Sequence, residues 1–277
     1  MNLTNTQTRI ISALVLLAVF VSCILIGVSA VKVLIGVIGL LIIDELHVQF
    51  FQVKRLGLIH ITSNIIFIAG FVFFAFMFET GLDFASLFMN AGLAVNAILI
   101  FYLFMSPHGE FGKILKFIKL VPQLSALYVL VVCLCLSTLL LYRDWIDLLA
   151  ILFLINFGMD TGAWFFGRKY GRHKLWAKVS PNKTVEGLLG GALTASVLGA
   201  GYWALRIGDK SAFAFTLFMG LGVISQIGDL VQSKFKRQFG IKDSSALIPG
   251  HGGVYDRVDS LIFVGPFFLK ALNYLHF

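Results

Sequence analysis

The sequence predicts an all-α, polytopic integral membrane protein, and two observations carry that prediction. Hydrophobic residues make up 58% of the 277 positions and charged residues only 13%, about half the charged share of an average soluble domain. The apolar residues also form continuous runs, most of which reach the roughly 20 residues that an α-helix needs to cross hydrocarbon. A spanning β-barrel would instead show ten-residue pieces of alternating hydrophobicity.

The apolar runs predict about nine transmembrane helices in a single domain, residues 1–277. The second run is short and the last is interrupted. The runs cover residues 10–30, 31–43, 56–78, 84–105, 123–141, 147–167, 184–205, 211–228 and 260–276. Arg9 and Val28-Ser29-Ala30 loosely imitate a secretory signal, but the first run is longer than a signal core and a new run starts at Val31. We expect residues 1–150 to be mainly scaffold and residues 151–277 to carry the chemistry.

The basic residues predict a cytoplasmic N-terminus and an outside C-terminus. With nine helices threaded in that orientation, most of the 22 lysines and arginines fall on the cytoplasmic side, as the positive-inside rule requires. The cytoplasmic set is Arg9, Lys54, Arg55, Lys113, Lys116, Lys119, Arg168, Lys169, Arg172, Lys174, Lys178, Lys183, Lys234, Lys236, Arg237, Lys242 and Arg257. The two richest basic loops, 168–183 and 229–259, then lie on the same side of the membrane.

Residues 229–259 form the most charged segment of the chain. At roughly 3 kcal/mol for each charged residue at a membrane centre, the segment would cost about 27 kcal/mol to bury in lipid. The residues counted are Asp229, Lys234, Lys236, Arg237, Lys242, Asp243, Asp256, Arg257 and Asp259. The segment therefore lies in water or lines a wet cavity. Loop 168–183, taken alone, is also explained as a topology signal and a contact for lipid headgroups.

The spacing of polar residues after the eighth run predicts a functional helix face. If that helix continues past Ile227, then Asp229, Ser233 and Lys236 lie on one face, at positions i, i+4 and i+7. A carboxylate, a hydroxyl and a cation would converge there, with Arg237 beside them.

The start of the last helix offers two further carboxylates, because Asp256 and Asp259 stand at i and i+3. Paired carboxylates without nearby cysteines or several histidines favour a hard cation, and Mg²⁺ is the natural choice. Residues 250–253, Gly-His-Gly-Gly, let backbone N–H groups approach an anion, and the neighbouring cations suit phosphate oxygens. Together these groups indicate phosphoryl or nucleotidyl transfer.

Two places outside this segment also indicate a site. Asp160 interrupts the sixth apolar run, and a carboxylate within a span is expected to face the protein interior. The stretch 180–187, Ser-Pro-Asn-Lys-Thr-Val-Glu-Gly, leads into the next helix, where Glu186 would complement the helix dipole. Close helix packing is expected at Gly187, Gly190 and Gly191.

Other polar and reactive residues are interpreted as structural. Asp44 and Glu45 end an apolar run and are expected to be solvated there. Cys23, Cys133 and Cys135 lie in apolar runs without disulfide or zinc spacing, so we expect small core residues.

Three stretches then carry a resemblance: SKFKR (233–237), KDSS (242–245) and LIPGHGGVYDRVD (247–259). Together they resemble the signature of the phosphatidate cytidylyltransferases, the CDP-diacylglycerol synthase family. Shorter matches are Asp160-Thr161, Gly167-Arg168, residues 180–187 and Gly228-Asp229-Leu230. The resemblance covers roughly residues 156–262, while the first half agrees only in hydropathy. Ser245 stands where many relatives have glycine, and Trp164 where tyrosine is frequent.

The resemblance implies transfer of the cytidylyl group of CTP to phosphatidic acid, giving CDP-diacylglycerol and pyrophosphate. It implies Mg²⁺, with room for a second cation. We expect the site at the cytoplasmic face of the membrane, and the short chain with no long soluble extension favours a bacterial plasma membrane over an organelle. Membrane lipids and a second copy of the chain are the implied partners, and nucleic acid is not. The implied metal ligands are Asp229 and Asp256. The implied catalytic residues are Asp229, Asp256, Asp259, Lys236 and Arg237. The implied substrate-binding residues are Ser233, Lys242, Asp243, His251, Gly252, Gly253, Arg257, Asp160, Lys183 and Glu186.

Two other functions compete with this one. A CTP-dependent lipid kinase would transfer the γ-phosphate to a polyprenol-type alcohol, but the full signature argues against it. A transporter or channel would gather its charges near the membrane midplane between repeated or broken helices. Here the charges collect at one predicted side, and no GxxxxGK[ST] phosphate loop is present in the sequence.

Overall fold

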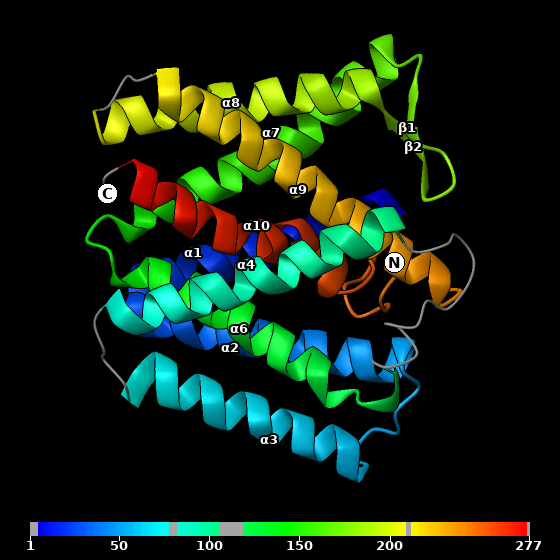
Figure 1. Ribbon diagram of the computed structural model, residues 1–277. Helices are drawn as coiled ribbons and strands as arrows, with labels where there is room; N and C mark the ends of the chain where they lie inside the picture. The colour runs from blue at the N-terminus through cyan, green and yellow to red at the C-terminus, as the bar shows by residue number, and fades with distance from the viewer. Residues whose placement is uncertain (1–4, 78–81, 106–118, 209–211, 276–277) are drawn as a thin grey trace.

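A computed structural model describes residues 5–77, 82–105, 119–208 and 212–275, which form a bundle of long helices (Figure 1). The α-helices of these described residues are α1 (Asn5–Ile26), α2 (Val28–Glu45), α3 (Leu58–Val72), α4 (Leu82–Met105), α6 (Gln123–Thr138), α7 (Trp145–Tyr170), α8 (Val185–Arg206), α9 (Ala212–Gln238) and α10 (Tyr255–Tyr274). Short helical segments continue three of them: η1 (Leu46–Phe50), η2 (Phe73–Met77) and η3 (Leu139–Leu141). Each of the nine predicted apolar runs corresponds to one α-helix.

Seven of the described helices, namely α1, α3, α4 and α6 to α9, are long and apolar enough to cross a membrane. This identifies the chain as an integral membrane protein. The predicted count of nine spans is therefore too high by this criterion. Helix α2 has 18 residues and includes Lys32 and the acidic pair at its end, whereas α10 opens on charged residues and contains Pro266. Both still form helices within the bundle.

The two termini lie at opposite ends of the bundle (Figure 1). The loop between α9 and α10 and the segment between α7 and α8 lie at the same end as the N-terminus. This arrangement agrees with the prediction that the two basic loops share one side. Lys113 and Lys116 of the predicted cytoplasmic set lie outside the described residues. The assignment of this end to the cytoplasm stays a prediction.

The all-α prediction treated the segment between α7 and α8 as a loop. The structure instead forms a short β-hairpin there. Strands β1 (Lys174–Trp176) and β2 (Ser180–Thr184) pair as an antiparallel hairpin. The hairpin forms where the sequence turns polar at a helix end, so that its backbone groups pair with each other outside the apolar helices. Thr184 then caps α8, because its side chain accepts a hydrogen bond from the Gly187 amide at 3.1 Å.

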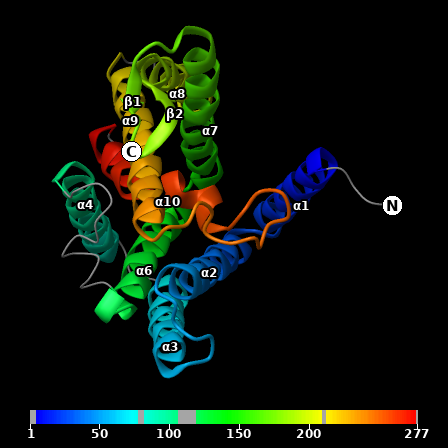
Figure 2. The ribbon, with the colours of Figure 1, turned by 90° about the vertical axis from the view of Figure 1, so that its right-hand side faces the viewer.

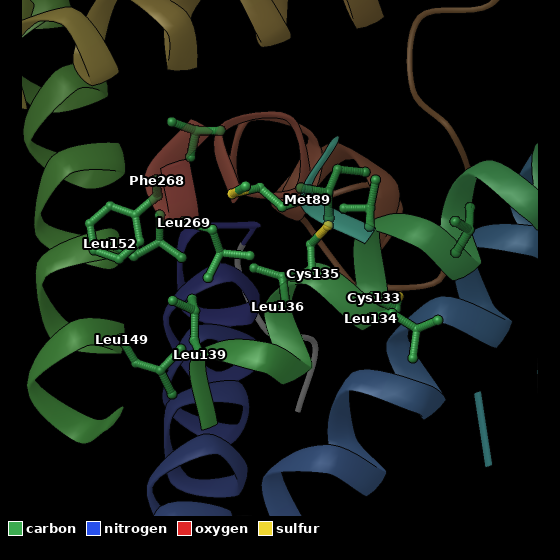
Figure 3. Packing of buried hydrophobic residues seen from close by; sticks show 14 of the residues in the cluster. Met89, Cys133, Leu134, Cys135, Leu136, Leu139, Leu149, Leu152, Phe268 and Leu269 are labelled. Atoms are coloured by element: carbon green, nitrogen blue, oxygen red, sulfur yellow. The ribbon is translucent and has the colours of Figure 1, made fainter. Parts of the chain in front are cut away.

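Helix α6 forms the centre of the apolar core (Figure 3). It places Cys135 against α4, where its Sγ lies 3.1 Å from the Phe88 oxygen, and Cys133 against α2, where its Sγ lies 3.9 Å from the Ile35 oxygen. Both cysteines are free and buried, which confirms the prediction of small core residues.

Helices α7 and α8 pack closely because glycines line their contact. A Cβ atom on Gly191 would lie 2.6 Å from the backbone oxygen of Met159, and one on Gly187 would lie 2.8 Å from that of Ala163. The predicted close packing is confirmed. Near the far end of the pair, Asp147 accepts hydrogen bonds from the Tyr202 hydroxyl at 2.8 Å and from Arg206 at 3.0 Å.

Candidate active site

Asp229 of α9 is held by a lysine from the hairpin and a serine from its own helix. Helix α9 does continue past Ile227, as far as Gln238. The Ser233 hydroxyl donates to Asp229 Oδ1 at 3.2 Å, which brings these two residues together as the spacing predicted. Asp229 Oδ2 forms an ion pair with the ammonium group of Lys183, so the hairpin is tied to α9.

Asp256, in the first turn of α10, is held by a lysine and by two backbone N–H groups. Its Oδ1 lies 2.8 Å from Lys236 Nζ, and its side chain is only 5% exposed. Its Oδ2 accepts the backbone N–H groups of Ser244 at 2.7 Å and Gly253 at 3.1 Å. Burial alone would raise the pKa of Asp256, but these hydrogen bonds outweigh it and hold the pKa below its usual value. Lys236 thus binds Asp256 rather than Asp229.

A second group of carboxylates lies around Asp229. Burial, and next the charge of Asp229, raise the pKa of Asp259 well above its usual value. Asp160 of α7 interacts electrostatically with Asp229, and with the cations of Lys183 and Arg257. Residue 160 is solvent-accessible, yet its carboxylate interacts with this charged cluster, so the expectation that it faces the protein interior stays a prediction. The Asp160 side chain turns toward the charged cluster because a carboxylate gains there from Lys183 and Arg257.

These carboxylates could bind a divalent cation, but they would not surround it on all sides. Among the residues that the structure describes, no three His, Cys, Asp or Glu side chains come together closely enough to hold a metal ion. The described contacts of Asp229 also do not include Asp256. Mg²⁺ commonly takes one or two carboxylates and completes its shell with water and substrate phosphates. The repulsion between Asp259 and Asp229 is a charge imbalance that such a cation would relieve.

The turn ahead of α10 is fastened by α1, which projects from the body beside it (Figure 2). Arg9 Nε donates to the Gly250 oxygen at 2.9 Å, and the Ser12 hydroxyl lies 2.8 Å from His251 Nδ1. Arg257 also donates to the backbone oxygen of His251 at 2.6 Å. These contacts hold the His251 turn from two separate segments, α1 and α10.

Some of the remaining predicted residues have structural contacts or conformations that explain them, and others are exposed side chains. Glu186 accepts the backbone N–H of His173 at 3.2 Å and lies 2.6 Å from its ring Nδ1, so it holds the start of the hairpin. Gly252 has a φ of +89°, which glycine adopts readily. The side chains of Lys242, Asp243 and Arg237 are exposed at the same end of the molecule. Their predicted roles toward substrate stay predictions.

The sequence interpretation missed Glu45, which is a buried part of this site. Glu45 is 2% exposed, so the expectation of a solvated flank is wrong for it. Its carboxylate accepts hydrogen bonds from the hydroxyls of Ser244 and Ser245 and from the amides of Val254 and Tyr255. Its neighbour Asp44 turns outward instead and pairs with Arg55 at 2.7 Å. One sequence signal could have indicated the buried role of Glu45. An acidic residue at the end of an apolar helix costs free energy to bury unless hydrogen-bond donors surround it.

The chain belongs to the cytidylyltransferase family, whose model matches residues 7–275. It is similar to proteins named phosphatidate cytidylyltransferase. It is 47% identical over 116 residues to that of Staphylococcus saprophyticus, over 41% of this chain and 44% of the relative. It is also 47% identical over 126 residues to that of Haemophilus influenzae, over 44% of each chain. The chain thus spans less than half the length of these curated relatives.

Proposed function

We propose that this protein transfers the cytidylyl group of CTP to phosphatidic acid and releases pyrophosphate. The observation that carries this proposal is the meeting of carboxylates and cations from α7, the hairpin, α9 and α10 at one end of an apolar bundle. Membership of the cytidylyltransferase family supports the reaction class, and the names of the partial relatives support the lipid acceptor.

A phosphate oxygen of phosphatidate attacks the α-phosphorus of CTP, and the bond between the α-phosphorus and the bridging oxygen breaks. The acceptor phosphate is already an anion at neutral pH, so positioning and charge neutralisation matter more than a strong base. A bound Mg²⁺ would neutralise phosphate charge, held by Asp229 and Asp256 with Asp259 nearby. Lys183, Lys236 and Arg257 supply fixed cations that orient anionic oxygens.

The proposal also sets the environment of the reaction. The site would face the cytoplasm of a bacterial plasma membrane, where CTP arrives from water and phosphatidate from the lipid. Two lysines of the site are each paired with a carboxylate, Lys183 with Asp229 and Lys236 with Asp256. We infer that substrate phosphates and the divalent cation arrive together, because either one alone would upset this balance of charge.

The position of the transferred phosphorus tests the proposal. The purified protein is given phosphatidate and Mg²⁺ with CTP labelled at either the α- or the γ-phosphate. Cytidylyl transfer places the α-label in the lipid product and releases the γ-label as pyrophosphate. Appearance of the γ-label in a lipid, with phosphatidate or with a polyprenol, would instead establish a lipid kinase.

A further inference from the structure

The side chain of Glu45 in α2 binds two separate parts of the loop between α9 and α10, namely Ser244 and Ser245 in its middle and Val254 and Tyr255 at the start of α10. Glu45 Oε1 accepts the Ser245 hydroxyl at 2.6 Å and the Val254 amide at 2.8 Å. Glu45 Oε2 accepts the Ser244 hydroxyl and the Tyr255 amide, both at 2.9 Å. A buried carboxylate without a basic partner is costly, and these four donors, two of them at the start of α10, offset that cost.

Ser244 connects this carboxylate to the one that meets Lys236. Its hydroxyl donates to Glu45, while its backbone N–H donates to Asp256 Oδ2 at 2.7 Å. Ser244 is fully buried, so water does not compete with either bond. Gly253 closes the other side of the loop in the same way, since its N–H also donates to Asp256 and its missing side chain leaves space for Glu45. A Cβ atom on Gly253 would lie 2.7 Å from both carboxylate oxygens of Glu45.

The segment that follows Glu45 is buried against α9 and α10. Phe50 of η1 stacks on Phe235 of α9 with ring centroids 5.1 Å apart, and its ring centroid lies 6.2 Å from that of Tyr255 in α10. Phe50 is 1% exposed. The chain next to Glu45 therefore packs against both helices that carry the site.

We propose that Glu45 is a positioning residue for the transfer reaction. It holds the two ends of loop 244–255 together and, through Ser244, fixes the orientation of the Asp256 carboxylate. This inference rests on the proposed function for its catalytic consequence, but the hold on the loop can be measured independently. It also gives a role to the first half of the chain, which hydropathy alone assigns to scaffold.

Glu45→Gln tests the proposal with almost no change in volume. Each carboxylate oxygen accepts one backbone N–H, from Val254 or from Tyr255. Whichever way the glutamine amide turns, its NH₂ group must therefore face a backbone donor. Asp44→Asn is the matched control, because it makes the same chemical change one residue away at an exposed ion pair with Arg55.

Two quantities are measured on folded protein that has been purified in detergent. The first is kcat, which we expect Glu45→Gln to lower by about 10- to 100-fold with little change in KM for CTP, as for other residues that orient a reacting group. The second is amide hydrogen exchange of peptides covering 244–255, which we expect to become about tenfold faster for the loss of one charge-assisted hydrogen bond. Asp44→Asn changes neither quantity.

Ser244→Ala is the second, milder variant, and it also serves if Glu45→Gln does not fold. It should lower kcat in the same direction, and the double variant should lose less than the product of the two single effects, because both act through one contact. Independent, multiplying effects would overturn the proposed route through Ser244.

The outcomes also separate this inference from the proposed function. If the wild-type protein does not transfer cytidylyl groups, the proposed function fails, and exchange alone decides whether Glu45 holds the loop. If the wild-type protein is active, unchanged kcat in Glu45→Gln overturns the inference. If amide hydrogen exchange of residues 244–255 is the same in Glu45→Gln as in the wild-type protein, the inference is overturned whether or not the protein is active.

Discussion

At the residue scale, the carboxylates of the site differ in what already binds them. Asp256 accepts three hydrogen bonds and one of its donors is a lysine, so its pKa is held low and it stays ionised at neutral pH. Asp259 is buried and also lies near the charge of Asp229, and both raise its pKa. Its carboxyl group is therefore stabilised by binding either a proton or a cation. This contrast makes Asp256 a fixed anion and Asp259 a group that responds to what is bound.

Asp256→Asn should fold and enter the membrane but lose turnover by about 100-fold or more. An amide is neutral, and its NH₂ group would face either Lys236 or the N–H groups of Ser244 and Gly253. The measurement is the rate of CDP-diacylglycerol formation at saturating Mg²⁺, with folding checked by a monodisperse profile in detergent. Near-normal turnover would contradict the assignment of Asp256 to the site.

Individual residues show how far the sequence could predict the site. The spacing of Asp229 and Ser233 correctly predicted their shared face, because helical periodicity is local. The partner of Lys236 could not be predicted in this way, since Asp256 reaches it across a loop. Glu45 was missed for the same reason: its partners lie about 200 positions away, at Ser244 and Ser245. Ser245, which departs from the frequent glycine, thereby gains a hydrogen-bonding role.

At the element scale, the antiparallel contact of α7 and α8 positions the hairpin. Glycines let the two helices approach, Asp147 joins them to Arg206 near one end, and Glu186 holds His173 near the other. The hairpin that follows α7 then delivers Lys183 to Asp229. A looser helix pair would move that lysine away from the site.

Gly191→Ala should destabilise the protein by about 1–3 kcal/mol, because the new methyl group would press on the Met159 backbone oxygen. Gly201→Ala on the same helix is the control. A Cβ atom there meets nothing within 4 Å, so the change should be neutral or stabilise by up to about 1 kcal/mol. Thermal unfolding in detergent measures both. Equal midpoints for the two variants would show that α7 and α8 do not need this close approach.

The elements themselves were largely predictable, because each apolar run of about 20 residues corresponds to one helix. Two features were not. The hairpin of β1 and β2 arises from five- and three-residue strands whose pairing has no strong sequence signal. Helix α9 begins with an apolar part and continues as a polar part to Gln238. Hydropathy predicts only the apolar part.

At the scale of the whole molecule, the chain separates an apolar bundle from one end where charged side chains gather. The carboxylates of α7, α9 and α10 meet the cations of the hairpin and of α9 at the end that also holds the N-terminus. Helices α1 and α2, far away in sequence, contact the same loop through Arg9, Ser12 and Glu45. Contacts to this loop therefore come from both halves of the chain, while the division into a scaffold part and a catalytic part stays a prediction.

The most direct test of the account is the reaction of CTP with phosphatidic acid by the detergent-purified protein, measured with and without Mg²⁺. CDP-diacylglycerol and pyrophosphate are quantified together. We expect both products in equal amounts, and only when Mg²⁺ is present. A folded protein that forms neither product with Mg²⁺, or forms both equally well after complete removal of divalent cations, would contradict metal-assisted cytidylyl transfer at this site.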